Sequence, residues 1–202
     1  MEELTPEIRH WTAVHPNGWR VSSYWLPGLK VLLDPLQVPD EVEEVEQIVL
    51  SNRHHRRSAF EAAARFGAEV RAPRAFTSGG PVEHYDFGEP LAGGEITAHQ
   101  VTELWPDDGA LHVPSLEALE IADTVLSEDG RLAFMPDVCF GDLDAEQRSI
   151  REGLARLADE LDFRHLLLAH GPPIADEGRE RLREFAGAQG PYRSASSSSR
   201  LR

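Results

Sequence analysis

The stretch that decides the fold is "QIVLSNRHHRRSAFEAAARFGAEV", residues 47–70. Residues 47–51 are an apolar run typical of a buried strand, and residues 58–67 predict an Ala-rich helix that Gly67 can end in a left-handed C-cap. Residues 68–73 predict a further strand. This strand–helix–strand order predicts a βαβ unit. The polar loop after the first strand carries two adjacent histidines and three arginines.

The composition limits the kinds of partner. The 202-residue chain has 20 Lys and Arg against 35 Asp and Glu, a net charge of −15. Such a surface repels nucleic acid and anionic membranes, and no stretch approaches the roughly 20 apolar residues that span a bilayer. The start "MEELTPEIRHW" is acidic and polar, unlike a secretory signal, and a single cysteine allows neither an intrachain disulfide nor a Cys-based zinc site. We expect a cytoplasmic protein with a small-molecule partner and no nucleic-acid or membrane partner.

The remaining elements are mostly short strands. Residues 18–26 and 29–35 predict a hairpin, and residues 39–47 predict a short acidic helix. Residues 144–161 predict an amphipathic helix that Asp144 can cap. Further strands are predicted at 95–104, 109–115, 118–126, 131–137 and 163–173, and a final helix at 177–187.

This element order predicts an α+β fold with four layers, in which two sheets pack face to face and helices cover their outer faces. We expect one domain over residues 1–187. Residues 74–94 are rich in Gly and Pro and predict a loop, while the Ser-rich tail 188–202 has no apolar pattern and is expected to be disordered.

The element order also resembles that of the metallo-β-lactamase superfamily over residues 18–187. The resemblance is carried by "LLDPL" (32–36), "VLSNRHHRRSA" (49–59), "ALEIADTVL" (118–126) and "LLLAHGPP" (166–173). It implies an αββα sandwich with one or two metal ions, usually zinc, at the edge between the sheets. In that family the ligands come from an H-x-H-x-D-H motif, a loop His, an Asp and a final His.

By this resemblance, three of the seven expected ligands are present: His54, Asp123 and His170. Asp34 matches a frequent acidic position behind the ligands. The other four positions hold Asn52, Arg56, Arg57 and Leu104. This set excludes a normal two-metal site, and it leaves either one divalent ion (zinc, iron or manganese) or none.

The arginines at this place favour two different interpretations. A guanidinium cannot deprotonate, and like charges about 4–6 Å apart cost on the order of several kcal/mol at an effective dielectric near 20. Arg57 could replace the metal's charge by pairing with Asp123. Alternatively, Arg56 and Arg57 could hold an anionic substrate group bidentately.

Several neighbouring residues have alternative interpretations. His54 is either a ligand or general base, or a structural hydrogen-bonding group. His55 matches no ligand position and is expected at the helix start or surface, although a small rotation would let it replace a lost ligand. The pair Asp107 and Asp108 favours a turn over a replacement carboxylate. Trp105 lies next to this loop and is a candidate ligand contact, and His112 is a candidate spare ligand.

Two functions follow from these interpretations. The first is a hydrolase in which His54, Asp123 and His170 hold one metal, and Arg56 or Arg57 orients a small anionic ester, thioester or related acyl compound. The second is a metal-free protein on the same scaffold that binds a small anion or a partner without turnover.

Overall fold

A computed structural model describes residues 1–77, 79–128 and 130–188, so the predicted tail lies, from residue 189 on, outside the described residues. Within these residues, one sheet has seven strands that follow sequence order. The first four are antiparallel neighbours, and β4 to β7 run parallel to one another. The strands are β1 (Glu2–Thr5), β2 (Ile8–Val14), β3 (Arg20–Leu26), β4 (Val31–Leu33), β5 (Gln47–Val49), β6 (Glu69–Pro73) and β7 (Glu83–Tyr85).

The second sheet has five strands in the order β14-β11-β10-β9-β8. Its β11 and β14 are parallel, whereas its other pairs are antiparallel. These strands are β8 (Pro90–Leu91), β9 (Ile96–Gln100), β10 (Gly109–Val113), β11 (Ala118–Ile121) and β14 (His165–Leu168). A separate hairpin consists of β12 (Leu126–Glu128) and β13 (Arg131–Ala133).

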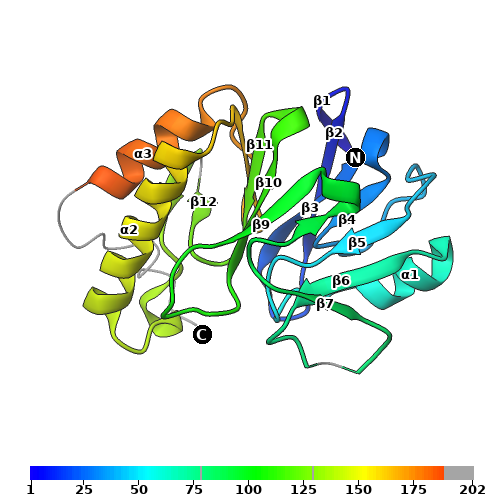
Figure 1. Cartoon of the computed structure of the whole chain (residues 1–202), viewed down its shortest axis with the longest axis horizontal. Helices are drawn as coiled ribbons and strands as arrows, with labels where there is room; N and C mark the ends of the chain where they lie inside the picture. The colour runs from blue at the N-terminus through cyan, green and yellow to red at the C-terminus, as the bar shows by residue number, and fades with distance from the viewer. Residues whose placement is uncertain (78, 129, 189–202) are drawn as a thin grey trace.

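The helices lie on the outer faces of the two sheets (Figure 1). Apolar residues of α1 pack with those of β4, β5 and β6, and apolar residues of α2 and α3 pack with those of β11 and β14. The helices are α1 (Ala59–Phe66), α2 (Leu143–Glu160) and α3 (Gly178–Gly187), with short 3₁₀ helices η1 (Pro27–Leu29), η2 (Ala92–Gly94), η3 (Pro114–Leu116) and η4 (Asp137–Cys139).

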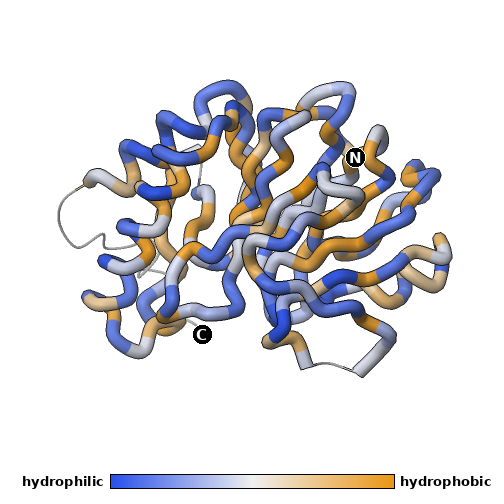
Figure 2. Tube along the Cα trace, viewed as in Figure 1, coloured by the Kyte–Doolittle hydropathy of each residue, from blue (hydrophilic) through white to orange (hydrophobic). Residues whose placement is uncertain are grey.

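A third apolar cluster joins the two sheets to each other. Tyr24, Leu33 and Val49 of the first sheet pack there with Leu111 and Leu167 of the second, and each of these side chains is at most 1% exposed. Hydrophobic residues are concentrated along these central strands (Figure 2). The predicted four-layer αββα arrangement is therefore confirmed. Among the described residues, no helix has the length and apolar character needed to cross a membrane.

Several individual elements differ from the predictions: the predicted loop 74–94 contains β7, β8 and η2, and the strand predicted over 118–126 ends at Ile121 as β11. The predicted helix over 39–47 is wrong, because this segment is irregular. Its carbonyl groups accept hydrogen bonds from the guanidinium of Arg65 instead, and Val42 and Val45 are buried beneath α1. The long amphipathic helix is confirmed as α2, but Asp142 caps it and Asp144 lies in its first turn. Strands β1 and β2 were not predicted.

Candidate functional site

Four candidate residues lie just beyond the carboxyl ends of parallel strands. Asp34 follows β4 and His55 lies in the loop after β5, while Asp123 follows β11 and His170 follows β14. Because β4 is parallel to β5 and β11 to β14, each pair of strands ends at one edge of its sheet. The packing of the sheets against each other brings the two edges together, as is usual for ligand sites in folds with parallel strands.

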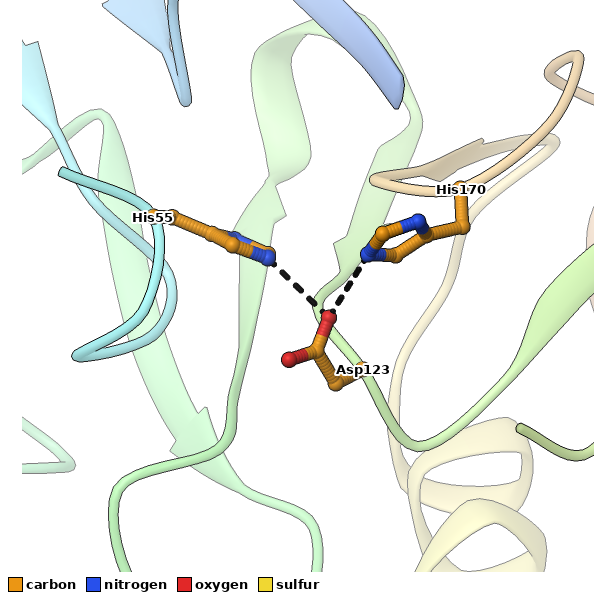
Figure 3. A group of neighbouring side chains, drawn as sticks. All are labelled: His55, Asp123 and His170. Atoms are coloured by element: carbon orange, nitrogen blue, oxygen red, sulfur yellow. Dashed lines mark hydrogen bonds and ion pairs between the residues drawn. The ribbon is translucent and has the colours of Figure 1, made fainter. Parts of the chain in front are cut away.

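His55, Asp123 and His170 form one cluster at this edge (Figure 3). Nε2 of His55 lies 3.0 Å and Nε2 of His170 lies 2.9 Å from the same oxygen, Oδ1 of Asp123. One ligand atom from each residue lies within 4.8 Å of the other two. The edge of the Trp19 ring packs against the His170 ring at a centroid distance of 5.4 Å. The two imidazoles therefore converge on one carboxylate oxygen.

Asp34 orients His55 from behind. Its carboxylate is fully buried, and its Oδ2 lies 2.7 Å from Nδ1 of His55. The backbone N–H of Ser51 donates to Oδ1 of Asp34 at 2.9 Å, and the Ser51 hydroxyl donates to Oδ2. His55 is thus held between two carboxylates, Asp34 on one ring nitrogen and Asp123 on the other.

The charges of this cluster stabilise one another. Burial and the charge of Arg57 lower the pKa of His55, but the carboxylates of Asp34 and Asp123 outweigh both and raise it to about 9. Burial opposes ionisation of Asp123, yet His55 and His170 hold the pKa of that carboxyl well below its usual range. In the metal-free cluster, His55 is therefore cationic at neutral pH and Asp123 is anionic.

Hydrogen bonds made by Asn52 and Asp108 hold the loop that carries Asp123. Asn52 donates to Oδ1 of Asp108 at 2.6 Å and to Oδ2 of Asp123 at 3.1 Å. Asp108 also accepts the backbone N–H groups of Asp123 and Thr124, at 2.9 and 3.1 Å. Burial, then the charge of Asp123, raises the pKa of Asp108 to about 7. Asp108 is therefore a buried support of the site loop, and Asp107 pairs with Arg53 at 2.9 Å.

The structure brings together Asp123 and His170 of the predicted ligands, but it does not bring His54 to them. His54 is exposed, and its Nε2 accepts a hydrogen bond from Nε of Arg53 at 3.1 Å. Its backbone N–H donates to Oδ1 of Asn52 at 2.7 Å, which closes a tight turn and directs the side chain outward. The expectation that His55 lies at the surface is wrong, since His55 is 4% exposed and occupies the cluster.

Arg57 contacts backbone carbonyls rather than Asp123. Its Nη1 donates to the carbonyls of Ser22 and Asp34 at 2.8 and 2.7 Å, and its Nη2 donates to that of Ala169 at 3.3 Å. Among the described residues no ion pair joins Arg57 to Asp123, so that expected pair is not formed. Three of the five N–H donors are used in this way, which leaves two for a ligand.

The other candidates lie in different surroundings. Arg56 is exposed and its guanidinium lies 5.1 Å from the centre of the Phe60 ring. His112 is bonded to the carbonyl of Asp162 at 2.9 Å, away from the cluster. Trp105 donates from Nε1 to the carboxylate of Glu146 at 2.8 Å.

Two cavities meet at Asp123. The smaller, of about 160 Å³, is lined by His55, Arg57 and His170. The larger, of about 410 Å³, is lined on one side by Trp105. Asp123 and His54 line both cavities, so a ligand that reaches Asp123 can extend in two directions. Such clefts of a few hundred Å³ suit small-molecule ligands.

Sequence reasoning placed His54 ahead of His55 as the ligand for a local reason. The family spacing assigns the ligand position to His54. His55 is the next residue, so a shift of one residue in the alignment exchanges the two histidines. The signal that distinguishes them is Asp34, a buried carboxylate that requires a hydrogen-bonding partner. That partner depends on the path of the loop, which includes a left-handed backbone at Arg57 (φ 37°).

Comparison with known proteins supports the fold. No protein-family model matches this chain, and no curated protein sequence matches it. Among solved structures, the DIM-1 metallo-β-lactamase is similar with a TM-score of 0.68 at 12% identity, covering 92% of this chain and 95% of that one. An archaeal metallo-β-lactamase superfamily protein from Sulfolobus tokodaii has a TM-score of 0.66 at 15% identity, covering 89% and 85%.

A third similar structure, TTHA1623 in a di-iron-bound form, has a TM-score of 0.57 at 15% identity and covers 90% of this chain and 96% of that one. At these identities the likeness concerns the fold. The chain therefore has the metallo-β-lactamase fold, and the resemblance inferred from its sequence is confirmed at that level.

Proposed function

We propose that this chain is a hydrolase that uses one divalent metal ion to cleave a small anionic ester, thioester or related acyl compound. The observation that carries the proposal is the convergence of His55, Asp123 and His170, with one ligand atom from each within 4.8 Å of the others. Three protein ligands with an open fourth position are typical of catalytic zinc sites. Imidazole and carboxylate ligands suit zinc, iron or manganese.

The surroundings of His55 fit such an ion. Metal-binding histidines usually donate their other ring N–H to a carboxylate, and Asp34 accepts from Nδ1 of His55 in this way. This bond orients Nε2 of His55 toward Asp123. The proton on that nitrogen must leave when a metal binds, so metal affinity should fall as the pH falls.

The chemistry that a divalent metal supplies is Lewis acidity, which makes water nucleophilic at neutral pH. Hydrolysis forms a bond from the water oxygen to the acyl carbon and breaks the acyl C–O or C–S bond, and a water proton ends on the leaving alcohol or thiol. Arg57 lines the smaller cavity, and its backbone contacts use three of its five guanidinium N–H donors. Its positive charge suits the negative group of the substrate.

The test is the metal content of the protein purified without added metal. We expect about one zinc, iron or manganese ion per chain. Asp123→Ala and His55→Ala should lose it, because each removes one of three ligands. His54→Ala is the matched control, since the neighbouring imidazole is exposed and should leave the metal content unchanged. Metal-free wild-type protein whose thermal stability ignores chelators would contradict the proposal.

A second candidate function is metal-free binding of a small anion, and one observation favours it. His55 as a cation already donates to Asp34 and Asp123, so a proton can occupy the place of a metal. The site then contains two cations, His55 and Arg57, and two carboxylates, Asp34 and Asp123. In this case Asp123→Ala should lower stability and leave metal content at zero, because it removes the partner of a buried charge.

A further inference from the structure

The larger cavity at the cluster has an apolar wall that the proposed reaction does not use. Leu104, Trp105, Pro106 and Met135 line this wall, and Leu104 is 52% exposed. Because Asp123 lines the same cavity, a group bound at the cluster has a continuous path to the wall. An exposed apolar surface inside a cleft favours an apolar part of a ligand.

Several of the polar groups that line this cavity already have partners. Arg53 contacts Asp107 at 2.9 Å, and Asn52 donates to Asp108 at 2.6 Å. The Glu146 carboxylate accepts two backbone N–H groups just before α2, at 3.1 and 3.0 Å. Burying a polar group without a partner costs free energy, so the cavity favours a ligand part that carries no polar atoms.

Trp105 is held in place before any ligand arrives. Its Nε1 donates to Glu146 at 2.8 Å, and its ring packs against Phe140 at a centroid distance of 5.2 Å. A side chain fixed in this way loses little conformational entropy when a ligand packs on it. The wall is thus a preorganised apolar surface.

We propose that the substrate carries an unbranched or lightly branched apolar arm of several carbons that packs against Trp105 and Leu104. This inference rests on the proposed function: the acyl carbon would lie at Asp123, where the two cavities meet, and the negative group would lie toward Arg57. Hydrolysis leaves a carboxylate, so the matching product is a medium-chain carboxylic acid. The arm is the part of the substrate that sets specificity.

The test measures binding of butyrate and octanoate by calorimetry to the protein as purified, without turnover. We expect the dissociation constant to fall about tenfold from butyrate to octanoate, because burying extra methylene groups is favourable. Trp105→Ala should abolish this gain and leave butyrate binding nearly unchanged. Phe66→Ala is the matched control, since Phe66 is also a half-buried aromatic residue but lies at the end of α1.

Two substitutions of exposed side chains test the same surface with less risk of misfolding. Leu104→Ser should reduce the gain, whereas Val14→Ser, which alters another exposed apolar side chain (58% exposed), should keep it. Equal affinities for the two acids, or a gain that survives Trp105→Ala, would overturn the apolar subsite. Hydrolysis of 4-(butanoyloxy)benzoate and 4-(octanoyloxy)benzoate, two anionic esters with a short and a long acyl arm, is assayed separately. A chain-length gain without hydrolysis of either ester would reject the proposed function and retain the subsite.

Discussion

At the scale of single residues, Asp34 decides which imidazole enters the cluster. A fully buried carboxylate is costly unless its oxygens are bonded, and Ser51 and His55 supply those bonds. The His55 ring is therefore fixed by a residue from a different strand. His54, which lacks such a partner, stays exposed.

We expect Asp34→Asn to weaken metal binding by roughly 10–100-fold, the usual effect of losing the carboxylate behind a histidine ligand. Titration of the metal-free variant with zinc against a competing chromophore measures this effect. Asp40→Asn, which changes an exposed carboxyl of the same type, should bind zinc like the wild type. Unchanged affinity in Asp34→Asn would show that its bond to His55 does not support a metal site.

The sequence identified some site residues better than others for a physical reason. Asp123 and His170 each lie two residues after a buried strand, so their positions follow closely from the sheet. His55 lies in a loop of several turns, where a one-residue difference exchanges an inward side chain for an outward one. Arg57 was expected to bind an anionic group or to pair with Asp123. It instead donates hydrogen bonds to carbonyl groups of residues that are distant in sequence. No local pattern encodes them.

At the scale of elements, Arg57 joins the ends of strands from both sheets. Its guanidinium donates to Ser22 in β3, to Asp34 after β4 and to Ala169 after β14. Asp34 orients His55, and Ala169 precedes His170. The same side chain that lines the smaller cavity therefore also fixes the strand ends that carry the cluster.

Arg57→Met should lower the free energy of unfolding by about 2–4 kcal/mol, because it removes several charge-assisted hydrogen bonds and leaves carbonyl groups unpaired. Arg56→Met is the matched control: that arginine is exposed and its guanidinium lies over the Phe60 ring, so a loss below about 1 kcal/mol is expected. Urea denaturation gives both values. Equal losses in the two variants would contradict a joining role for Arg57.

Elements with strong local signals were predicted well, and those that depend on distant partners were not. Helix α1 ends as expected at Gly67, whose φ of 72° suits glycine, and α2 follows its apolar spacing. The acidic segment 39–47 has helical composition, yet Arg65 of α1 binds its carbonyls and keeps it irregular. That competition arises from tertiary contacts.

At the scale of the whole molecule, the two sheets share polar as well as apolar contacts. The Tyr24 hydroxyl of β3 donates to the carbonyl of Leu168 in β14 and accepts the backbone N–H of the same residue, each at 2.8 Å. A fully buried side chain that satisfies both backbone groups of the other sheet fixes how the sheets face each other. The cluster takes His55 from a loop of the first sheet and Asp123 and His170 from loops of the second, so it depends on this alignment.

Three imidazoles that are removed from solvent should each lower the free energy of unfolding in mild acid. Burial lowers the pKa of His10, His99 and His165 below the ordinary value of 6.5. For His99 the charges of His112 and Arg156 lower the pKa further. The unfolded chain binds protons at these histidines near pH 6.5, whereas the folded chain does not. Their contribution to the free energy of unfolding is therefore complete above that pH and is lost as the pH falls.

We therefore expect these three histidines to lower the urea midpoint of the metal-free protein as the pH falls from about 7.5 to 5.5, against the opposite contributions of His55 and Asp108, whose raised pKa values favour the folded chain over this range. His99→Gln should lose less over this range than the wild type, because one of the three titrating groups is gone. His84→Gln, which replaces an exposed imidazole, should follow the wild-type slope. The same slope in all three proteins would mean that the imidazole of His99 is protonated as readily in the folded chain as in the unfolded one. Its burial would then carry no proton-linked stability.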